Sequence, residues 1–308
     1  MNEMPRVRCS AGLQEAVVEH LLRQQHAGDE AGYERYRKAA DRIYIQYADA
    51  ESRLLAFRRL YARFFEELGC MRIIAAMLAP LTGRIPEVLM ARAWSPSEEG
   101  AELGRDGRTL GLRILPTRFS SPSELERVLR HELGHVADML DPTFEYGAGL
   151  VEGTAPARRT LGDRFGLLWD CTVDGRTARS GAVPWRTRAE YEEACVRMFH
   201  RLPAESVKAV VGRLWEGERL DYPALVRFAA DETALSAWAG VAADEPQAAS
   251  PVPGGPCPLC GFPTHAWAAS FDPQVVRLIQ ADFPTWQPHQ DACERCVEGY
   301  AVRLMLSR

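Results

Sequence analysis

The sequence predicts an α+β protein that is mostly helical, with a small sheet and a separate, metal-stabilised tail. Three observations lead to this prediction. Residues 11–79 are rich in Ala, Leu, Arg and Glu, with apolar side chains at helical spacing. Residues 109–119 alternate apolar and other side chains, as a strand does, and a helix-forming segment at 121–140 follows directly. The last 52 positions, 257–308, contain two closely spaced cysteine pairs.

We expect four segments along the 308 residues. Residues 1–80 form an N-terminal helical region, and 81–238 form the domain that holds the strand and the helix after it. Residues 239–256 are dense in Ala, Pro, Gly and Ser and are typical of a linker. Residues 257–308 form the cysteine-containing domain. A chain of this length can bury one sizeable core and still include a small second domain.

Composition limits the class of partner. The net charge is −5, so the overall field repels phosphates, and nucleic acid is not expected as a partner. The first 20 residues lack an apolar run of signal-peptide length, and no segment reaches the roughly 20 apolar residues that a membrane span needs. We therefore expect a cytoplasmic protein without a membrane partner. The oligomeric state is left open.

The helix predicted at 121–140 has a well-defined start. Ser121 is a good N-cap, Pro122 suits the first helical position, and Glu124 completes a capping-box pattern. The apolar residues at helical spacing predict one buried face: Leu125, Val128, Leu129, Val136 and Leu140. Further helices are expected over 157–176, ending near Gly175, and from Thr187 to about Trp238.

The first helix carries the motif His131-Glu132-Leu133-Gly134-His135, an HExxH pattern. Histidines four residues apart lie one helical turn apart and about 40° around the axis, so both imidazoles can reach one Zn²⁺ at about 2.0–2.1 Å. Glu132 is rotated by about 100° from His131 and can take a proton from a water on the metal. The simpler alternative is a pair of ordinary histidines beside a glutamate that forms an ion pair.

In this motif the chain resembles the zinc metallopeptidases of the zincin class. The resemblance implies that His131 and His135 bind a catalytic zinc and that Glu132 is the general base. It also implies the fold of a minimal zincin, with a small sheet beside the HExxH helix.

A catalytic zinc normally has a third protein ligand, and Asp170 is the preferred candidate. In LLWDCTVDGR, Asp170 and Asp174 lie four residues apart on one helical face. This resembles the ExxxD helix of gluzincins with a shortened first acid, and aspzincins also use an aspartate. The resemblance implies that Asp170 binds zinc and that Asp174 orients a zinc-bound histidine. Two solvated acids near a helix end are the simpler alternative.

Other residues remain open as the third ligand. Asp141 follows the motif in HExxHxxDxxD, which resembles the metzincin pattern with Asp138 where a glycine is usual. If the helix continues, Asp141 lies about 15 Å along its axis from His131, too far to share a metal. Three more candidates are Glu192, Glu152 and His200. Tyr146 and His200 are candidates for donating a hydrogen bond to an oxyanion.

The tail contains Cys257-x-x-Cys260 and Cys293-x-x-Cys296. Two such turns present four thiolates to one ion, which predicts a closed four-cysteine zinc ribbon whose metal contributes folding energy. The acidic residues around these pairs favour protein contact over DNA. The four other cysteines, each isolated, are expected to be small buried hydrophobes: Cys9, Cys70, Cys171 and Cys195.

The order of an HExxH domain, a linker and a C-terminal four-cysteine ribbon resembles the SprT-like metallopeptidases. The combined hypothesis is a zinc-dependent peptidase with one catalytic and one structural zinc, acting on a peptide or protein substrate. The alternative is a non-enzymatic adaptor, a zincin scaffold whose ribbon binds protein or nucleic acid.

Overall fold

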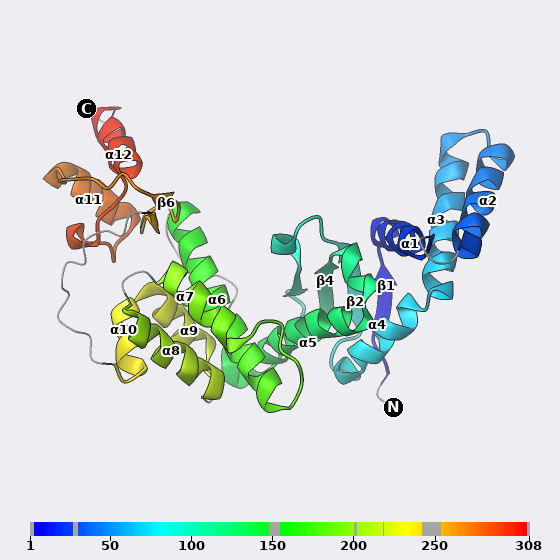
Figure 1. The fold of residues 1–308 in the computed structure, drawn as a ribbon, viewed down its shortest axis with the longest axis horizontal. Coiled ribbons are helices and arrows are strands. Elements are labelled where there is room, and N and C mark those ends of the chain that lie inside the picture. The colour runs from blue at the N-terminus through cyan, green and yellow to red at the C-terminus, as the bar shows by residue number, and fades with distance from the viewer. Residues whose placement is uncertain are drawn as a thin grey trace. The chain divides into compact units, whose positions relative to one another are not determined.

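The computed structural model is mostly helical with a small mixed sheet, which confirms the predicted α+β class at that level (Figure 1). It describes residues 3–26, 30–147, 155–199, 202–217, 219–241 and 254–306. The chain divides into two compact units, Met1–Leu140 and Asp141–Arg308. Most of the predicted linker, 242–253, lies outside the described residues.

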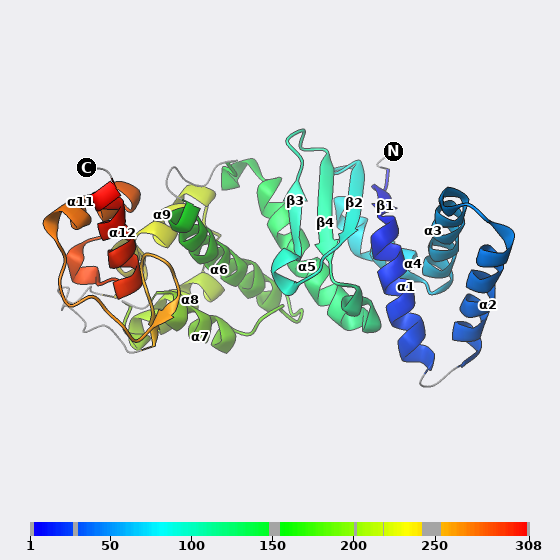
Figure 2. The ribbon, with the colours of Figure 1, turned by 90° about the horizontal axis from the view of Figure 1, so that it is seen from above.

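The first unit contains a four-stranded sheet formed by β1 (Arg6–Cys9), β2 (Glu87–Arg92), β3 (Gly100–Leu103) and β4 (Thr109–Ile114). The strand order is β1-β2-β4-β3, with β1, β2 and β4 parallel and β3 antiparallel to β4 at one edge (Figure 2). Leu110, Leu112 and Ile114 are all buried, so the predicted alternation in β4 is confirmed. The strand is shorter than 109–119 because a 3-10 turn begins at Pro116.

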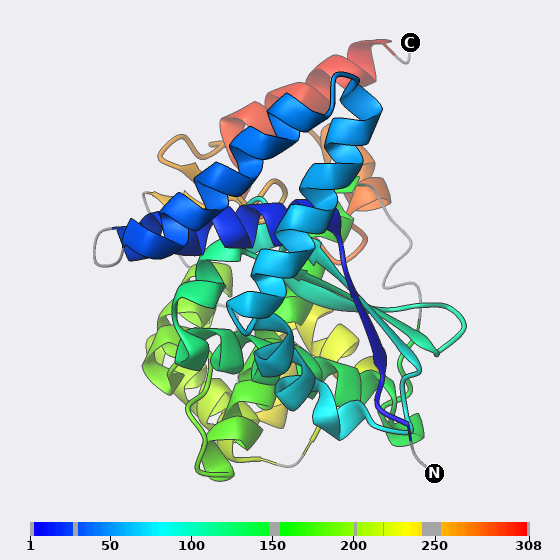
Figure 3. The ribbon, with the colours of Figure 1, turned by 90° about the vertical axis from the view of Figure 1, so that its right-hand side faces the viewer.

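The N-terminal region forms four helices: α1 (Ala11–His26), α2 (Glu30–Gln46), α3 (Ala50–Glu67) and α4 (Cys70–Leu78). Asp49 caps α3 by accepting a hydrogen bond from the Ser52 amide, and Gly69 adopts a left-handed conformation between α3 and α4. Figure 3 shows α2 and α3 side by side as a helical hairpin. These helices share one hydrophobic core with the sheet and with α5 (Pro122–Met139), which carries the HExxH motif.

The start of α5 follows the prediction in part. The Ser121 hydroxyl accepts a hydrogen bond from the Glu124 amide, and Pro122 occupies the first turn. The Glu124 carboxylate, however, pairs with Arg118 from the preceding turn. The predicted apolar face is confirmed: Leu125, Val128, Leu129 and Val136 are buried, and Leu140 is half-buried at the C-cap.

The second unit is built on α6 (Ala155–Arg179), against which α8 (Ala204–Glu216) and α9 (Tyr222–Ala230) pack. Two further helices are α7 (Arg188–Met198) and α10 (Glu232–Trp238). The prediction that the first of these helices ends near Gly175 is wrong, because α6 continues to Arg179. A Cβ atom at Gly175 would lie 2.4 Å from the carbonyl oxygen of Trp215 in α8. Gly175 therefore permits a close helix–helix approach and does not end a helix.

The cysteine-containing tail folds as a short hairpin and two helices. The hairpin strands are β5 (Gly255–Pro256) and β6 (Pro263–Thr264), and the helices are α11 (Pro273–Asp282) and α12 (Glu294–Leu306). Helix α11 lies between the two cysteine pairs in the sequence. Within the described part of the chain, no helix is both long and apolar enough to cross a bilayer.

Candidate metal centres

The two histidines of α5 point their rings at a common position. Both side chains are buried, with 6% of His131 and 7% of His135 exposed. Their Nε2 atoms lie 3.2 Å apart, and the ring planes are nearly perpendicular, at 84°. One helical turn separates the residues, and the buried face of α5 directs both rings inward.

This spacing fits a tetrahedral metal. Two nitrogens bound at about 2.05 Å to one zinc, at the tetrahedral angle, lie about 3.3 Å apart. The observed 3.2 Å agrees with that value. Two imidazoles with one carboxylate are also a usual donor set for zinc. The residues present therefore fit a zinc ion. That the metal is zinc is a proposal.

Asp170 of α6 offers the third ligand atom. Nitrogens of His131 and His135 and a carboxylate oxygen of Asp170 all lie within 4.8 Å of one another. Asp170 is half-buried, and its neighbour Trp169 is buried among aromatic rings, including Phe144 and Phe165. These three residues form one of two groups among the described residues that could hold a metal ion.

Asp174, one turn after Asp170, is fully buried and anchors the loop before α7. Its carboxylate accepts hydrogen bonds from the amides of Trp185 (3.0 Å) and Arg186 (2.8 Å) and from the Tyr191 hydroxyl (2.7 Å). Buried carboxylates require such donors, because an uncompensated charge in the protein interior is strongly destabilising. The idea that Asp174 orients a zinc-bound histidine stays a prediction.

Asp141 has a structural role at the end of α5. It is the N-cap of the turn Pro142–Phe144, accepting hydrogen bonds from the amide and the hydroxyl of Thr143, and it forms an ion pair with Arg219. The hydrogen bonds from Thr143, and then the Arg219 guanidinium, lower the pKa of Asp141 to about 2. Asp141 is not a member of the group formed by His131, His135 and Asp170.

The other candidates are distributed as follows. Glu192 accepts a hydrogen bond from Arg188 one turn earlier on α7, at 3.2 Å, and is likewise outside the group. Glu152 and His200 lie outside the described residues. Tyr146 is 43% exposed, and its ring contacts Trp169 and Tyr222. Its proposed donation to an oxyanion stays a prediction.

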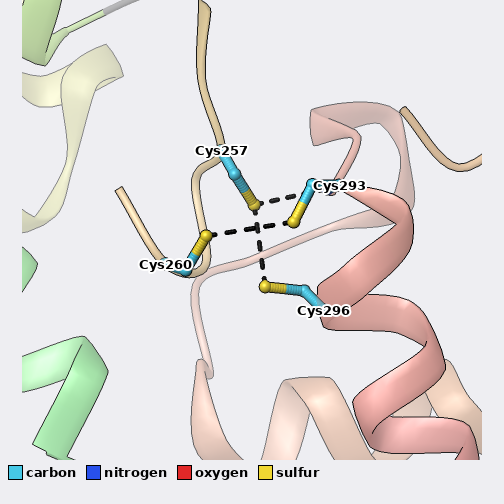
Figure 4. Close-up of side chains that lie close together, drawn as sticks. All are labelled: Cys257, Cys260, Cys293 and Cys296. Carbon is cyan, nitrogen blue, oxygen red and sulfur yellow. Dashed lines mark hydrogen bonds between the residues drawn. The ribbon is translucent and has the colours of Figure 1, made fainter. Parts of the chain in front are cut away.

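The second group consists of the four paired cysteines of the tail, whose sulfur atoms point toward one another (Figure 4). Cys257 and Cys260 lie on the turn between β5 and β6, and Cys293 and Cys296 lie at the start of α12. Gly261, directly after Cys260, adopts φ = 74°, a left-handed conformation that glycine permits and that the tight turn uses.

The sulfur–sulfur distances fit a tetrahedral ion. Cys257 Sγ lies 3.9 Å from Cys296 Sγ, and Cys260 Sγ lies 3.9 Å from Cys293 Sγ. Four sulfurs at about 2.3 Å from zinc lie about 3.8 Å apart, whereas a disulfide needs about 2.05 Å. The four cysteines are therefore not joined as disulfides, and their geometry fits a group that could hold one metal ion.

Backbone donors also favour thiolate at this site. The amides of Leu259 and Cys293 point at Cys257 Sγ, at 3.4 and 3.3 Å. The hydrogen bond with Cys296, together with these amides, lowers the pKa of the Cys257 thiol to about 5. A small core that includes Leu259, Ile279 and Trp286 supports the site. Deprotonated sulfur is the form that binds zinc.

Sequence reasoning missed one charged cluster near α5. Glu99 and Arg118 form a partly buried ion pair, and Arg118 also pairs with Glu124. The strands β3 and β4 lie between Glu99 and Arg118 in the sequence, so no local sequence pattern joins the two residues. Comparisons of the chain with protein-family models, with curated proteins and with solved structures found no match.

Proposed function

We propose that the protein is a zinc-dependent peptidase whose catalytic residues are His131, Glu132 and His135 of α5 with Asp170 of α6. The single observation that supports this best is the convergence of two imidazole nitrogens and one carboxylate oxygen within 4.8 Å. Three protein ligands leave one tetrahedral position open, which is typical of a catalytic zinc and not of a structural one.

The reaction follows from the roles of these side chains. A zinc ion held there supplies a water of lowered pKa, about 7, and a positive charge for the substrate carbonyl. His131, His135 and Asp170 bind the ion. Glu132 accepts a proton from the attacking water and delivers it to the leaving amine as the peptide bond breaks. These roles are those implied by the resemblance to zincins.

The position of strand β3 supports the proposal that the substrate is a peptide. It is the edge strand of the sheet beside α5, and an extended peptide can add to such an edge through backbone hydrogen bonds. A Cβ atom at Gly100, the first residue of β3, would lie 4.0 Å from Glu132 Oε2. A peptide paired with β3 would therefore pass close to the general base.

The second ion that we propose is a structural zinc bound by Cys257, Cys260, Cys293 and Cys296. The domain around it buries few apolar side chains, so metal binding supplies part of its folding free energy. An HExxH domain followed by such a ribbon is the arrangement that resembles SprT-like metallopeptidases.

One observation favours the alternative of a protein-binding adaptor. Large apolar side chains are exposed on the ribbon domain, including Phe262 (66%) and Met305 (70%). Exposed apolar side chains of this kind are typical of protein contact surfaces. The peptidase requires a catalytic α5 site, whereas the adaptor does not. Measuring substrate cleavage together with the number of zinc ions per chain therefore distinguishes the two functions.

The test uses unfolded casein as substrate and compares wild type, Glu132→Gln and Glu126→Gln. Glu126 lies on the same helix and pairs with Arg130, so its variant is a matched control. We expect about 100-fold or greater loss of cleavage in Glu132→Gln, with two zinc ions retained per chain, and unchanged cleavage in Glu126→Gln. Cleavage by Glu132→Gln at the wild-type rate would refute the peptidase proposal. An inactive wild type that holds one zinc would favour the adaptor.

A further inference from the structure

Glu99, Arg118 and Glu124 form a charged cluster in the first unit. Arg118 donates to both carboxylate oxygens of Glu99, with Nε at 3.2 and 3.1 Å and Nη2 at 2.6 Å. Its Nη1 reaches the Glu124 carboxylate. The side chains of Arg118 and Glu99 are 14% and 8% exposed, so water screens their interaction weakly. Glu99 Oε1 also accepts the Leu115 amide at 2.9 Å.

The cluster connects three backbone segments. Glu99 immediately precedes β3, Leu115 follows β4, and Glu124 lies in the first turn of α5. Arg118 stands on the turn Pro116–Ser120 between β4 and α5. A planar guanidinium with two opposed partners fixes both distance and orientation, which a single ammonium cannot do.

One of the connected segments, the start of β3, lies near the proposed general base. Gly100 follows Glu99 directly, and its Cβ position is 4.0 Å from Glu132 Oε2. β3 packs against α5, and Figure 2 shows this edge strand beside the helix. A displacement of Glu99 would therefore move the start of β3 relative to Glu132.

We infer that Arg118 is a positioning residue, which holds the start of β3 at a fixed distance from the Glu132 carboxylate through its paired contacts with Glu99 and Glu124. The inference rests on the proposed function, because the position of β3 matters for turnover only if a peptide binds beside it. In this role Arg118 acts through Glu99 and Glu124. Loss of the Arg118 guanidinium would change the alignment of β3, and of a peptide bound to it, with Glu132. A misplacement of about 1 Å can lower the rate of a reaction by about 100-fold.

The main variant is Arg118→Lys, which keeps the charge and loses the paired geometry. Arg130→Lys is the matched control, because Arg130 pairs with Glu126 on the more exposed side of α5. Glu99→Gln is a second variant, isosteric and still able to accept the Leu115 amide, in case Arg118→Lys fails to fold. Each full-length, zinc-loaded protein is examined for kcat and KM on a casein-derived peptide, for zinc per chain, and for amide hydrogen exchange over 99–104.

We expect Arg118→Lys and Glu99→Gln to retain two zinc ions, to exchange the amides of β3 faster, and to lower kcat by about tenfold or more with a smaller change in KM. Arg130→Lys should match wild type in all three measurements. Faster exchange with unchanged kcat would overturn the inference and leave Arg118 a purely structural residue. Unchanged exchange and unchanged kcat would overturn it as well. A wild type without turnover refutes the proposed function and the inference together, whereas an active wild type matched by Arg118→Lys refutes the inference alone.

Discussion

The hydroxyl of Tyr191 on α7 donates a 2.7 Å hydrogen bond to the fully buried carboxylate of Asp174 on α6. Burial first, and then the charges of Asp170 and Asp174, raise the pKa of Tyr191 well above its usual range. The phenol therefore stays protonated and remains a donor to Asp174. This contact fixes α7 against α6 beside the residue proposed as the third zinc ligand.

Replacing Tyr191 by Phe should lower the free energy of unfolding by about 1.5–3 kcal/mol, the usual contribution of a hydrogen bond to a charged group. Urea unfolding at saturating zinc measures the change. Tyr44→Phe is the control. Because Tyr44 is 62% exposed, this replacement should change the free energy of unfolding little. If Tyr191→Phe instead weakened zinc binding without changing stability, Asp174 would act on the metal site and not mainly on the loop.

Replacing Gly175 by Ala should destabilise the protein by about 1–3 kcal/mol, as overpacking usually does. The added Cβ would meet the Trp215 carbonyl oxygen at 2.4 Å, and backbone cannot move aside as a side chain can. Gly166→Ala in the same helix is the control. No described atom lies within 4 Å of its Cβ position, so we expect stabilisation by about 0.5–1 kcal/mol. Thermal unfolding of the two variants should shift in opposite directions, and equal shifts would contradict the close approach of α6 and α8.

Replacing Asp170 by Asn should weaken binding of the proposed catalytic zinc, because a neutral amide is a poorer ligand than a carboxylate. We expect one zinc per chain after dialysis, against two in wild type. Asp141→Asn tests the rival assignment and should retain both ions, since Asp141 serves the turn at Thr143 and the pair with Arg219. Metal analysis that gave the reverse result would make Asp141 the ligand.

Cysteine alkylation should divide the thiols into two classes. Burial raises the pKa of Cys70 and of Cys195 to about 12, so both stay protonated and unreactive in the folded protein at pH 8. In the unfolded chain these thiols ionise at about pH 8.5.

The free energy of unfolding should therefore fall as the pH rises above that value, because only the unfolded state loses the thiol protons of Cys70 and Cys195.

The cysteines of the ribbon should respond to metal removal instead. We expect Cys257, Cys260, Cys293 and Cys296 to resist iodoacetamide with metal bound and to react together after a strong chelator is added. Mass spectrometry of labelled peptides gives the answer for each thiol. Reaction of these four at the same rate with and without chelator would argue against a bound ion.

Much of the local structure was predictable from sequence because it depends on neighbouring residues. The alternation of Leu110, Leu112 and Ile114 predicted β4, and Ser121 with Pro122 predicted the start of α5. The helical spacing over 11–79 predicted helices, although their number depends on breaks such as Gly69. The end of α6 was mispredicted because a glycine is ambiguous in sequence. At Gly175 it serves a contact with α8, and only tertiary packing distinguishes that use from a helix end.

The same distinction applies to the candidate metal centres. The sequence alone determined that His131 and His135 lie one helical turn apart and that two CxxC turns can converge, since helix and turn geometry fix these spacings. Only the tertiary structure decided that Asp170 joins the two histidines while Asp141 serves a turn, and that Glu99 meets Arg118. Those residues belong to different elements, so their distances follow from how apolar faces pack and from the requirement that buried charges find partners.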